Sequence, residues 1–559
     1  MSGAARVALA QINPVVGALE DNAELIIRYL ALARDAGAGL AVFPELAICG
    51  YPPEDLLTLP AFIRRCAEAA GRVALHAQGI VAVVGAPVEV AGELFNSALI
   101  LGEGRVLGRV DKAELPNYGV FDERRYFTPG RNGPLVSACG AAAGVSVCED
   151  IWVSNDLLTR QAAEGARFLV NLSSSPYRLG AKDERLRLVG GHARRLGLPM
   201  LYCNLVGGQD ELVFDGGSFA CGPDGALMAR ARFFEEELLI VDVAPAAARP
   251  ARREMIGIAA DNPEAPPVAA PLAPPLADEE EIYSALRLGV RDYVRKNGFK
   301  AVVVALSGGV DSALTLAVAV DALGPEAVTA VYMPSPFSSP QSGADAAVTA
   351  ANLGVTLLTL PIEALMREYE QALAPLFAGR GRDITEENIQ SRIRGSLLMA
   401  LSNKFGWLAL TTGNKSEIAV GYCTLYGDTV GGFAVIKDLF KTKVYALCQW
   451  RNRQAGCALI PRSVIEKEPS AELKPDQRDS DSLPEYPVLD RILEEYIERR
   501  KDVDEIVKLG YSKALVRQVV RMVDKSEYKR RQGPIGVKIT PKAFGRDRRH
   551  PITNRFENE

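Results

Sequence analysis

Residues 301–312 read AVVVALSGGVDS and decide the fold of the second half of this chain. A run of apolar residues that includes three successive valines ends in Ser307, Gly308 and Gly309, and the apolar segment ALTLAVAVDALG follows at residues 313–324. This order predicts a buried strand, a tight turn and a helix. The glycines let the turn curl, so that backbone N–H groups and the helix N-terminus can bind a phosphate. The GxxxxGK[ST] pattern of a Walker loop is absent, and a plain glycine turn is the alternative interpretation.

Length and composition place the chain among large globular enzymes. At 559 residues it is too long for one core, and length alone predicts roughly three or four domains. Hydrophobic residues make up 48% and charged residues 24%, and the net charge of −5 argues against a general nucleic-acid binder. The sequence has no charged leader before an apolar core and no apolar run of membrane-spanning length, so we expect a cytoplasmic protein without a membrane partner.

Cysteine and histidine usage narrows the chemistry. The nine cysteines include no CxxC pair, so we expect reduced thiols, most of them in the core. The only histidines are His76, His192 and His550, which argues against Ser-His-Asp chemistry and against a zinc site built from several histidines. A cysteine nucleophile in this chain must therefore find a base other than histidine.

The pattern along the chain predicts two α/β domains joined by a linker. Residues 1–245 alternate apolar strands with amphipathic helices, residues 246–277 are rich in Ala and Pro, and a second alternation typical of a parallel sheet occupies residues 278–559. The segment 525–549 carries nine Lys and Arg against Glu527 and Asp547. We expect about half of those charges to be solvated, and the stretch lacks the aromatic interleaving of a nucleic-acid site.

Three reactive residues of the first half each follow a predicted strand. Glu45 ends the strand in AVFPEL, Lys112 follows a predicted hairpin strand, and Cys148 ends the strand in GVSVCED. Because strand ends border the site in α/β folds, the three side chains can converge on one pocket. Taken alone, a cysteine at a strand end is more often packing, and a charged residue after a strand is more often solvated.

The spaced motifs FPEL, DKAELPNYGVFDERRYF and VCED resemble the three catalytic signatures of the nitrilase–amidase superfamily, in order. The resemblance covers about residues 4–245 and implies an αββα sandwich. It also implies that Glu45 is the general base and that Lys112 stabilises the oxyanion and favours the thiolate of Cys148. Glu123 would position the lysine.

Local residues resemble the glutaminase members of that superfamily. The segments PNYGVFDERRYF and NLSSSPY carry this likeness, which implies that Tyr118, Glu149 and Ser175 bind glutamine, with Lys182 near its carboxylate. The family usually places that lysine directly after a glycine, whereas Ala181 intervenes here.

The SGGVDS turn resembles the loop of enzymes that split ATP into AMP and pyrophosphate on a Rossmann-like parallel α/β domain. Four later segments distinguish between these enzymes, because all four resemble NAD synthetase. They are ENIQSRIRG, TTGNKSE, YGDTVGGFAVIKDLFKTKVY and EYKRRQGPIGVK. Together with the glutaminase-like first half, the whole chain resembles the glutamine-dependent NAD synthetases.

The resemblance implies a role for each matching residue. Asp311 and Glu417 would hold Mg²⁺ as hard oxygen ligands. The residues implied for ATP are Ala305, Leu306, Ser307, Gly308, Gly309, Val310, Asp311, Ser312, Thr412, Lys441 and Thr442. Those implied for nicotinic acid adenine dinucleotide (deamido-NAD) are Asn388, Arg392, Arg394, Glu417 and Lys529.

The resulting hypothesis is a ligase of the last step of NAD biosynthesis. Glutamine would give up ammonia at Cys148, and ammonia would travel through a shielded tunnel between the domains to an adenylated nicotinate carboxyl. The family implies a homo-oligomer, in many bacteria an octamer. The alternatives are a synthetase for another acceptor, as in asparagine or GMP synthetases, an amidase with a ligand-sensing second half, and an interaction scaffold.

Overall fold

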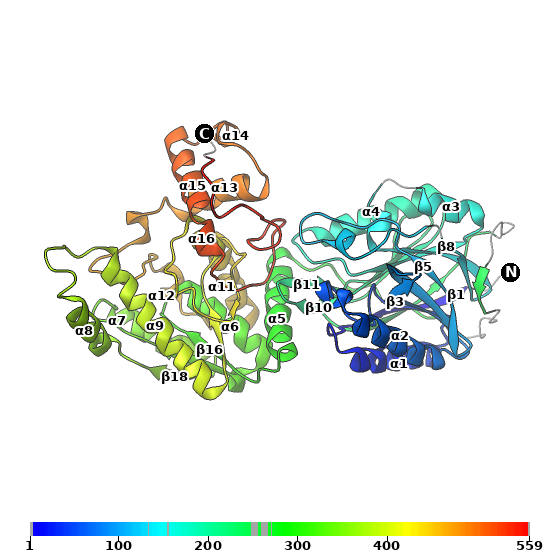
Figure 1. Cartoon of the computed structure of the whole chain (residues 1–559), viewed down its shortest axis with the longest axis horizontal. Coiled ribbons are helices and arrows are strands. Elements are labelled where there is room, and N and C mark those ends of the chain that lie inside the picture. The colour runs from blue at the N-terminus through cyan, green and yellow to red at the C-terminus, as the bar shows by residue number, and fades with distance from the viewer. Residues whose placement is uncertain are drawn as a thin grey trace. The chain divides into compact units, whose positions relative to one another are not determined.

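The computed structural model describes residues 4–131, 133–153, 156–247, 255–258, 267–269 and 271–556. The chain divides into two compact units, Met1–Leu276 and Ala277–Glu559, and Figure 1 labels some of their elements. None of the helices in the described part of the chain is both long and apolar enough to cross a membrane.

Two sheets packed face to face form the first unit. Their orders are β14-β1-β2-β3-β4-β5 and β13-β12-β9-β8-β7-β6-β15, and β10 and β11 form a separate hairpin. The strands are β1 (Ala5–Gln11), β2 (Leu40–Val42), β3 (Val81–Val90), β4 (Glu93–Gly102), β5 (Arg105–Asp111), β6 (Leu135–Ala138), β7 (Ala141–Val147), β8 (Phe168–Ser173), β9 (Met200–Asn204), β10 (Val206–Gln209), β11 (Leu212–Asp215), β12 (Phe219–Cys221), β13 (Leu227–Arg230), β14 (Glu237–Val243) and β15 (Met255–Gly257).

Helices cover the outer face of each sheet. The helices are α1 (Leu19–Asp35), α2 (Pro60–Leu75), α3 (Leu157–Glu164) and α4 (Ala181–Leu196). Side chains of β1, such as Leu9, pack with side chains of β8, such as Val170, in the core between the sheets. Helices α1 and α2 pack on the first sheet, and α3 and α4 pack on the second. These four layers are the predicted αββα sandwich, and strands such as β1 are wholly buried because both of their faces are covered.

The described parts of the Ala/Pro-rich segment lie along the first unit. Strand β15 pairs with β6 in parallel, and Leu272 forms a bridge with Arg230 of β13. The backbone N–H of Val268 donates to Asp242 at 2.9 Å. This segment therefore contributes to the second sheet of the first unit.

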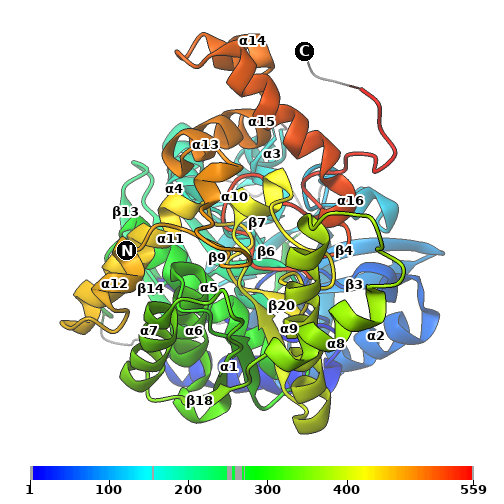
Figure 2. The same ribbon diagram turned by 90° about the vertical axis from the view of Figure 1, so that its left-hand side faces the viewer.

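The second unit contains a five-stranded parallel sheet of order β18-β17-β16-β19-β20. Figure 2 shows α6 and α9 beside this sheet. The chain reverses its direction of travel across the sheet between β16 and β19, which is where open parallel sheets bind ligands. The strands are β16 (Val302–Ala305), β17 (Val328–Tyr332), β18 (Thr356–Thr359), β19 (Leu408–Thr411) and β20 (Phe433–Ala434).

The helices of the second unit form two groups. The first group contains α5 (Asp278–Lys296), α6 (Val310–Leu323), α7 (Pro340–Asn352), α8 (Glu363–Leu373), α9 (Ile384–Phe405), α10 (Lys415–Val420), α11 (Lys441–Ala455) and α12 (Arg462–Glu466). The second contains α13 (Tyr486–Leu493), α14 (Val503–Val507), α15 (Lys513–Lys525) and α16 (Glu527–Arg530). Helices α13 and α15 share a separate apolar cluster with α10.

The basic segment 525–549 is folded onto this second group of helices. Three of its nine cationic side chains, Arg530, Lys538 and Arg548, are buried. Lys538 Nζ lies 2.6 Å from Asp547 Oδ2, and the partner of Arg530 is Glu527. Part of this positive charge is therefore neutralised within the fold.

Candidate active sites

Glu45, Lys112 and Glu123 meet in the interior of the first unit. Lys112 follows β5, and its Nζ lies 2.6 Å from Glu45 Oε1 and 2.8 Å from both carboxylate oxygens of Glu123. Cys148 begins the short 3₁₀ turn after β7. Its positive φ of 41° turns the backbone away from the direction of the strand. Lys112 and Glu45 are wholly buried, and Cys148 is 4% exposed. The structure thus brings the predicted strand-end residues into one cluster.

Lys112 is a permanent cation in this cluster. Burial lowers the pKa of Lys112, but the carboxylates of Glu123 and Glu45 outweigh burial and hold that pKa well above its ordinary value. Burial and the neighbouring Glu45 charge raise the pKa of Glu123 against the opposite pull of Lys112. The Lys112 ammonium therefore faces the carboxyl groups of both Glu45 and Glu123. With two carboxyl groups beside one cation, one of them can take up a proton during the reaction.

The resting Cys148 is a thiol. Burial and the charge of Glu45 raise the pKa of Cys148 well above its ordinary value, although Lys112 pulls in the other direction. Lys112 therefore does favour the thiolate, as expected, but burial and Glu45 outweigh it, and sequence spacing does not report burial. A protonated thiol needs a base at the moment of attack, and Glu45 is the carboxylate next to it.

Several groups that sequence reasoning missed hold the two carboxylates in place. Asn96 Nδ2 donates to Glu45 Oε1 at 2.8 Å, and the backbone N–H of Ser174 donates to Glu45 Oε2 at 3.0 Å. Tyr51 donates its hydroxyl to Glu123 Oε1 at 2.9 Å. These residues come from three separate segments, and no local motif marks them.

The predicted glutamine-binding residues lie in different segments of the first unit. Tyr118 is 58% exposed and donates its hydroxyl to both oxygens of Glu149 at 3.0 and 3.1 Å. Ser175 lies in the loop after β8, one residue beyond the Ser174 that binds Glu45. Lys182 lies in the first turn of α4, where its Nζ donates to the Leu276 carbonyl at 3.1 Å.

A cavity of about 640 Å³ lies in the second unit at the reversal point of the sheet. Gly308 is not among its lining residues, and neither is Thr442, whose backbone N–H donates to Asp490. The predicted residues that do line it are Ala305, Leu306, Ser307, Gly309, Val310, Asp311, Ser312, Asn388, Arg392, Arg394, Thr412, Glu417, Lys441 and Lys529. All of the predicted ATP and deamido-NAD residues except Gly308 and Thr442 therefore line one cavity.

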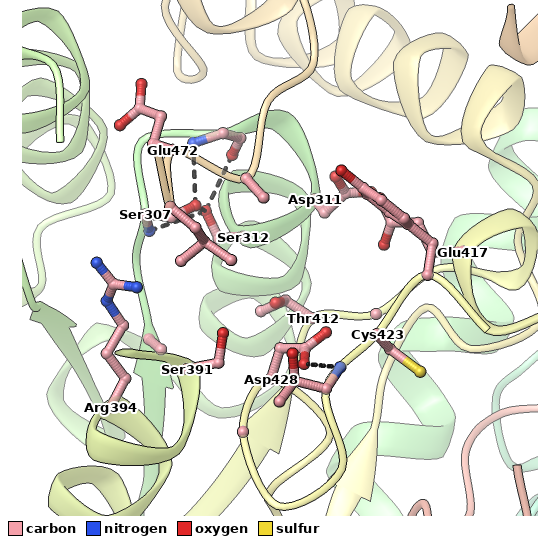
Figure 3. Close-up of a pocket in the computed structure, with 18 of the residues that line it drawn as sticks. Ser307, Asp311, Ser312, Ser391, Arg394, Thr412, Glu417, Cys423, Asp428 and Glu472 are labelled. Atoms are coloured by element: carbon pink, nitrogen blue, oxygen red, sulfur yellow. Dashed lines mark hydrogen bonds between the residues drawn. The ribbon is translucent and has the colours of Figure 1, made fainter. Parts of the chain in front are cut away.

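The glycine turn connects β16 to α6 and lines the cavity there. The Ser312 hydroxyl donates to the Gly309 carbonyl at 2.9 Å and accepts from the backbone N–H of Ser307 at 3.2 Å (Figure 3). Gly308 has a φ of 82°, and a Cβ there would lie 2.2 Å from the Ser342 carbonyl oxygen. Only glycine fits at this position, which keeps the turn close to the start of α7.

Two carboxylates flank a lysine at one side of the cavity. Lys441 Nζ lies 2.5 Å from Asp311 Oδ2 and 3.1 Å from Glu417 Oε1. Burial lowers the pKa of Lys441, but Asp311 and Glu417 outweigh burial and raise it, whereas burial raises the pKa of Glu417 to about 7. Asn414, which sequence reasoning missed, donates to Asp311 Oδ1 at 2.9 Å.

Cations line the part of the cavity next to α9. Arg394 is mostly buried, donates Nε to the Met333 carbonyl at 2.9 Å, and lies on the same side of the cavity as Ser307 in Figure 3. Burial lowers the pKa of Arg394 to about 10, so the side chain remains charged at neutral pH. Lys529 Nζ donates to the carbonyls of Gly421 and Cys423 at 2.7 and 2.8 Å. An anionic ligand is the natural complement of these charges.

The two units define a ligase that couples amide hydrolysis to nucleotide-dependent amidation. Residues 6–253 match the carbon-nitrogen hydrolase family model, and residues 282–533 match the NAD synthase model. The chain belongs to the glutamine-dependent NAD(+) synthetase family, and this membership confirms both the predicted family and the predicted fold class.

Relatives match this chain along its whole length. The glutamine-dependent NAD(+) synthetase of Thermotoga maritima is 46% identical, with 99% of each chain covered. The enzyme of the same name from Xanthomonas campestris pv. campestris is 46% identical, with 99% of this chain and 98% of that chain covered. A solved structure of the Acinetobacter baumannii enzyme in complex with ADP is 42% identical, with a TM-score of 0.76 and 98% of each chain covered. This chain is accordingly a carbon–nitrogen ligase of NAD biosynthesis, and a synthetase for another acceptor, an amidase with a sensing half and a scaffold are all ruled out.

Proposed function

We propose that this ligase runs its two half-reactions at the two clusters described above, glutamine hydrolysis at Cys148 and amidation of deamido-NAD in the cavity of the second unit. The observation that carries the proposal is the presence in one chain of the buried Lys112–Glu45–Glu123 cluster and of the cavity with its Asp311–Lys441 pair. Either cluster alone would leave half of the chemistry unexplained.

The first half-reaction is nucleophilic. Cys148 Sγ attacks the side-chain amide carbon of glutamine while Glu45 takes the thiol proton, which Glu45 then gives to the leaving ammonia. Lys112 donates to the oxyanion of the tetrahedral intermediate, and Tyr118, Glu149, Ser175 and Lys182 bind glutamine. Water then hydrolyses the thioester, which releases glutamate and restores the thiol.

The second half-reaction activates a carboxylate. The nicotinate carboxylate of deamido-NAD attacks the α-phosphorus of ATP, and pyrophosphate leaves. Ammonia then attacks the acyl adenylate, which forms the amide of NAD and releases AMP. The glycine turn and Ser312 bind the phosphates, while Lys441 neutralises the departing pyrophosphate. Thr442, which donates to Asp490 outside the cavity lining, has no contact role in this step. Arg392, Arg394, Asn388 and Lys529 bind the anionic acceptor.

Asp311 and Glu417 are the residues that would hold Mg²⁺. Their oxygens fit a hard cation, and both already face the Lys441 ammonium. No cluster of three or more potential metal ligands occurs among the residues that the structure describes, so phosphate oxygens and water would complete the shell. When bound, the ion supplies positive charge to the phosphates of ATP.

Location and assembly are further parts of the proposal. All nine cysteines are free thiols, which supports a reducing compartment such as the cytoplasm. We also propose that the chain forms a homo-oligomer, with an octamer as the state suggested by the family resemblance. The proposed partners are the small molecules glutamine, ATP and deamido-NAD. Light scattering of the purified chain measures the assembly, and a monomeric mass would contradict the oligomer.

The test of the proposal separates the two nitrogen donors. Cys148→Ala should abolish NAD synthesis from glutamine and preserve synthesis from ammonia, both measured in the presence of deamido-NAD, Mg²⁺ and ATP. Cys221→Ala is the matched control, because Cys221 is equally buried but lies in the core of the second sheet. Loss of both activities in Cys148→Ala, with Cys221→Ala active, would overturn the role of Cys148.

A further inference from the structure

A buried ion pair lies behind the loop that follows β8. Arg185 of α4 is 2% exposed, and Asp215 at the end of β11 is 1% exposed. Arg185 Nη1 donates to both carboxylate oxygens of Asp215, at 2.7 and 2.9 Å. Desolvation makes such a pair costly unless further hydrogen bonds satisfy its remaining donors and acceptors.

The other donors of Arg185 reach the loop itself. Its Nε donates to Ser175 Oγ at 3.2 Å, and its Nη2 donates to the carbonyls of Ser175 and Pro176 at 3.4 and 3.1 Å. A guanidinium can only donate, so Ser175 Oγ is the acceptor of the first of these bonds. The hydroxyl proton of Ser175 is therefore available to another acceptor, and the buried Tyr202 hydroxyl lies beside it in this structure.

The preceding residue of the same loop is fixed to the proposed base. The backbone N–H of Ser174 donates to Glu45 Oε2 at 3.0 Å, and its hydroxyl donates to the Glu45 carbonyl at 2.8 Å. The backbone N–H of Ser175 donates to Asn204 Oδ1 at 3.0 Å. Residues 174–176 are thus held between Glu45 on one side and Arg185 on the other.

The register of the second sheet brings this loop to Cys148. Val147 of β7 pairs with Leu172 of β8, so Cys148 and Ser173 leave neighbouring parallel strands at the same level. Lys182, one turn before Arg185 on α4, instead donates to the Leu276 carbonyl. Arg185 is a cation of this helix whose hydrogen bonds reach the glutamine-binding loop.

We propose that Arg185 and Asp215 form a positioning pair for glutamine recognition. The pair holds Ser175 so that its hydroxyl donates to an oxygen of bound glutamine, and it contacts neither glutamine nor the reacting atoms. This inference rests on the proposed function, because it takes Ser175 as a glutamine contact. Asp215 in turn fixes the guanidinium, because both of its carboxylate oxygens accept from Arg185 Nη1.

The test uses Arg185→Lys and Asp215→Asn. In Arg185→Lys, a single ammonium cannot bind Asp215 and the loop at the same time as the guanidinium does. In Asp215→Asn, the amide removes the negative charge that holds the guanidinium. We expect the KM for glutamine to rise about 10- to 100-fold in both variants, with kcat changed less than about threefold. Synthesis from ammonia should keep its parent rate and KM. A loss of folded enzyme alone would lower the apparent kcat and leave the KM unchanged.

Arg6→Lys is the matched control. Arg6 donates Nε and Nη2 to Asp242 at 2.7 and 2.9 Å, and it lies at the start of β1 in the same unit. Its KM for glutamine should equal that of the parent. A rise in Arg6→Lys as large as in Arg185→Lys, or a parental KM in Asp215→Asn, would overturn the positioning role.

Ser175→Ala separates this inference from the proposed function. If Ser175→Ala leaves the KM for glutamine unchanged, the proposed contact between Ser175 and glutamine is wrong, and the positioning role fails with it. If Ser175→Ala raises the KM while both Arg185→Lys and Asp215→Asn leave it unchanged, only the positioning role is wrong. Arg185→Lys combined with Ser175→Ala should raise the KM no further than Ser175→Ala does, because both changes act on one hydroxyl.

Discussion

Lys112 Nζ donates to Glu45 Oε1 at 2.6 Å, so the proposed oxyanion donor rests directly against the proposed base. Glu45 is a better partner for Lys112 while it is ionised than after it has taken the thiol proton. Protonation of Glu45 during attack therefore weakens this contact at the moment when the oxyanion forms. Lys112 can then turn one N–H toward the oxyanion while Glu123 continues to hold the ammonium.

Glu123→Gln tests the arrangement around Lys112. The amide keeps the size of the side chain but removes the negative charge that faces the lysine, so Lys112 binds Glu45 more tightly and stabilises the oxyanion less. We expect synthesis from glutamine to fall about 100-fold or more, and synthesis from ammonia to be unchanged.

Two variants calibrate this result. Tyr51→Phe removes only the 2.9 Å hydrogen bond to Glu123 and should cause a smaller loss. Glu103→Gln, in an exposed turn, should leave both activities at the parent level. Equal rates from glutamine in Glu123→Gln and the parent would contradict a catalytic role for the Lys112–Glu123 contact.

Alkylation of Cys148 should depend steeply on pH. Because burial and Glu45 raise the pKa of Cys148 above its ordinary value, the thiolate fraction is small at neutral pH and grows about tenfold per pH unit up to that pKa. Iodoacetamide should therefore label Cys148 faster at each step from pH 7 to pH 9, without a plateau. The measurement is mass spectrometry of the Cys148 peptide in a Cys457→Ser background, because Cys457 is exposed. A plateau below pH 7 would indicate a thiolate in the resting site.

Asp311→Asn should inactivate the second half-reaction for both nitrogen donors. The variant removes the charge that faces Lys441, and with it one proposed Mg²⁺ ligand. NAD formation and pyrophosphate release should fall at least about 100-fold, while some glutamine hydrolysis persists. Asp321→Asn is the control, since Asp321 lies on the same helix α6 and pairs with Arg451. Full synthesis from ammonia in Asp311→Asn would remove Asp311 from the proposed site.

Local sequence patterns were sufficient for the elements that carry the chemistry. The apolar run and glycine turn at residues 301–312 correspond to β16 and to the start of α6, because strand, turn and helix signals there act over a few residues. Lys112 likewise directly follows β5, whereas β2 ends at Val42, so Glu45 lies in the turn beyond the strand and does not end it as predicted.

The supporting residues could not be predicted because their partners depend on strand register and burial. Asn96 is one polar residue within β4, and only the folded arrangement places its amide 2.8 Å from Glu45. The charge state of Cys148 depends on its burial, which spacing does not report. The predicted role of Lys182 rests on the resemblance alone, and its ammonium donates to the carbonyl of Leu276 in the structure.

Arg394→Met should weaken the binding of deamido-NAD. Arg394 keeps its charge at neutral pH although burial lowers its pKa to about 10, and Nε is already held by the Met333 carbonyl, so its remaining N–H groups can bind an anion. We expect the KM for deamido-NAD to rise about 10- to 100-fold with either nitrogen donor, because a charge-assisted hydrogen bond is lost. Arg382→Met, which removes an exposed partner of Glu370, is the matched control. Titration calorimetry with deamido-NAD checks both variants, and equal affinities would place the acceptor away from Arg394.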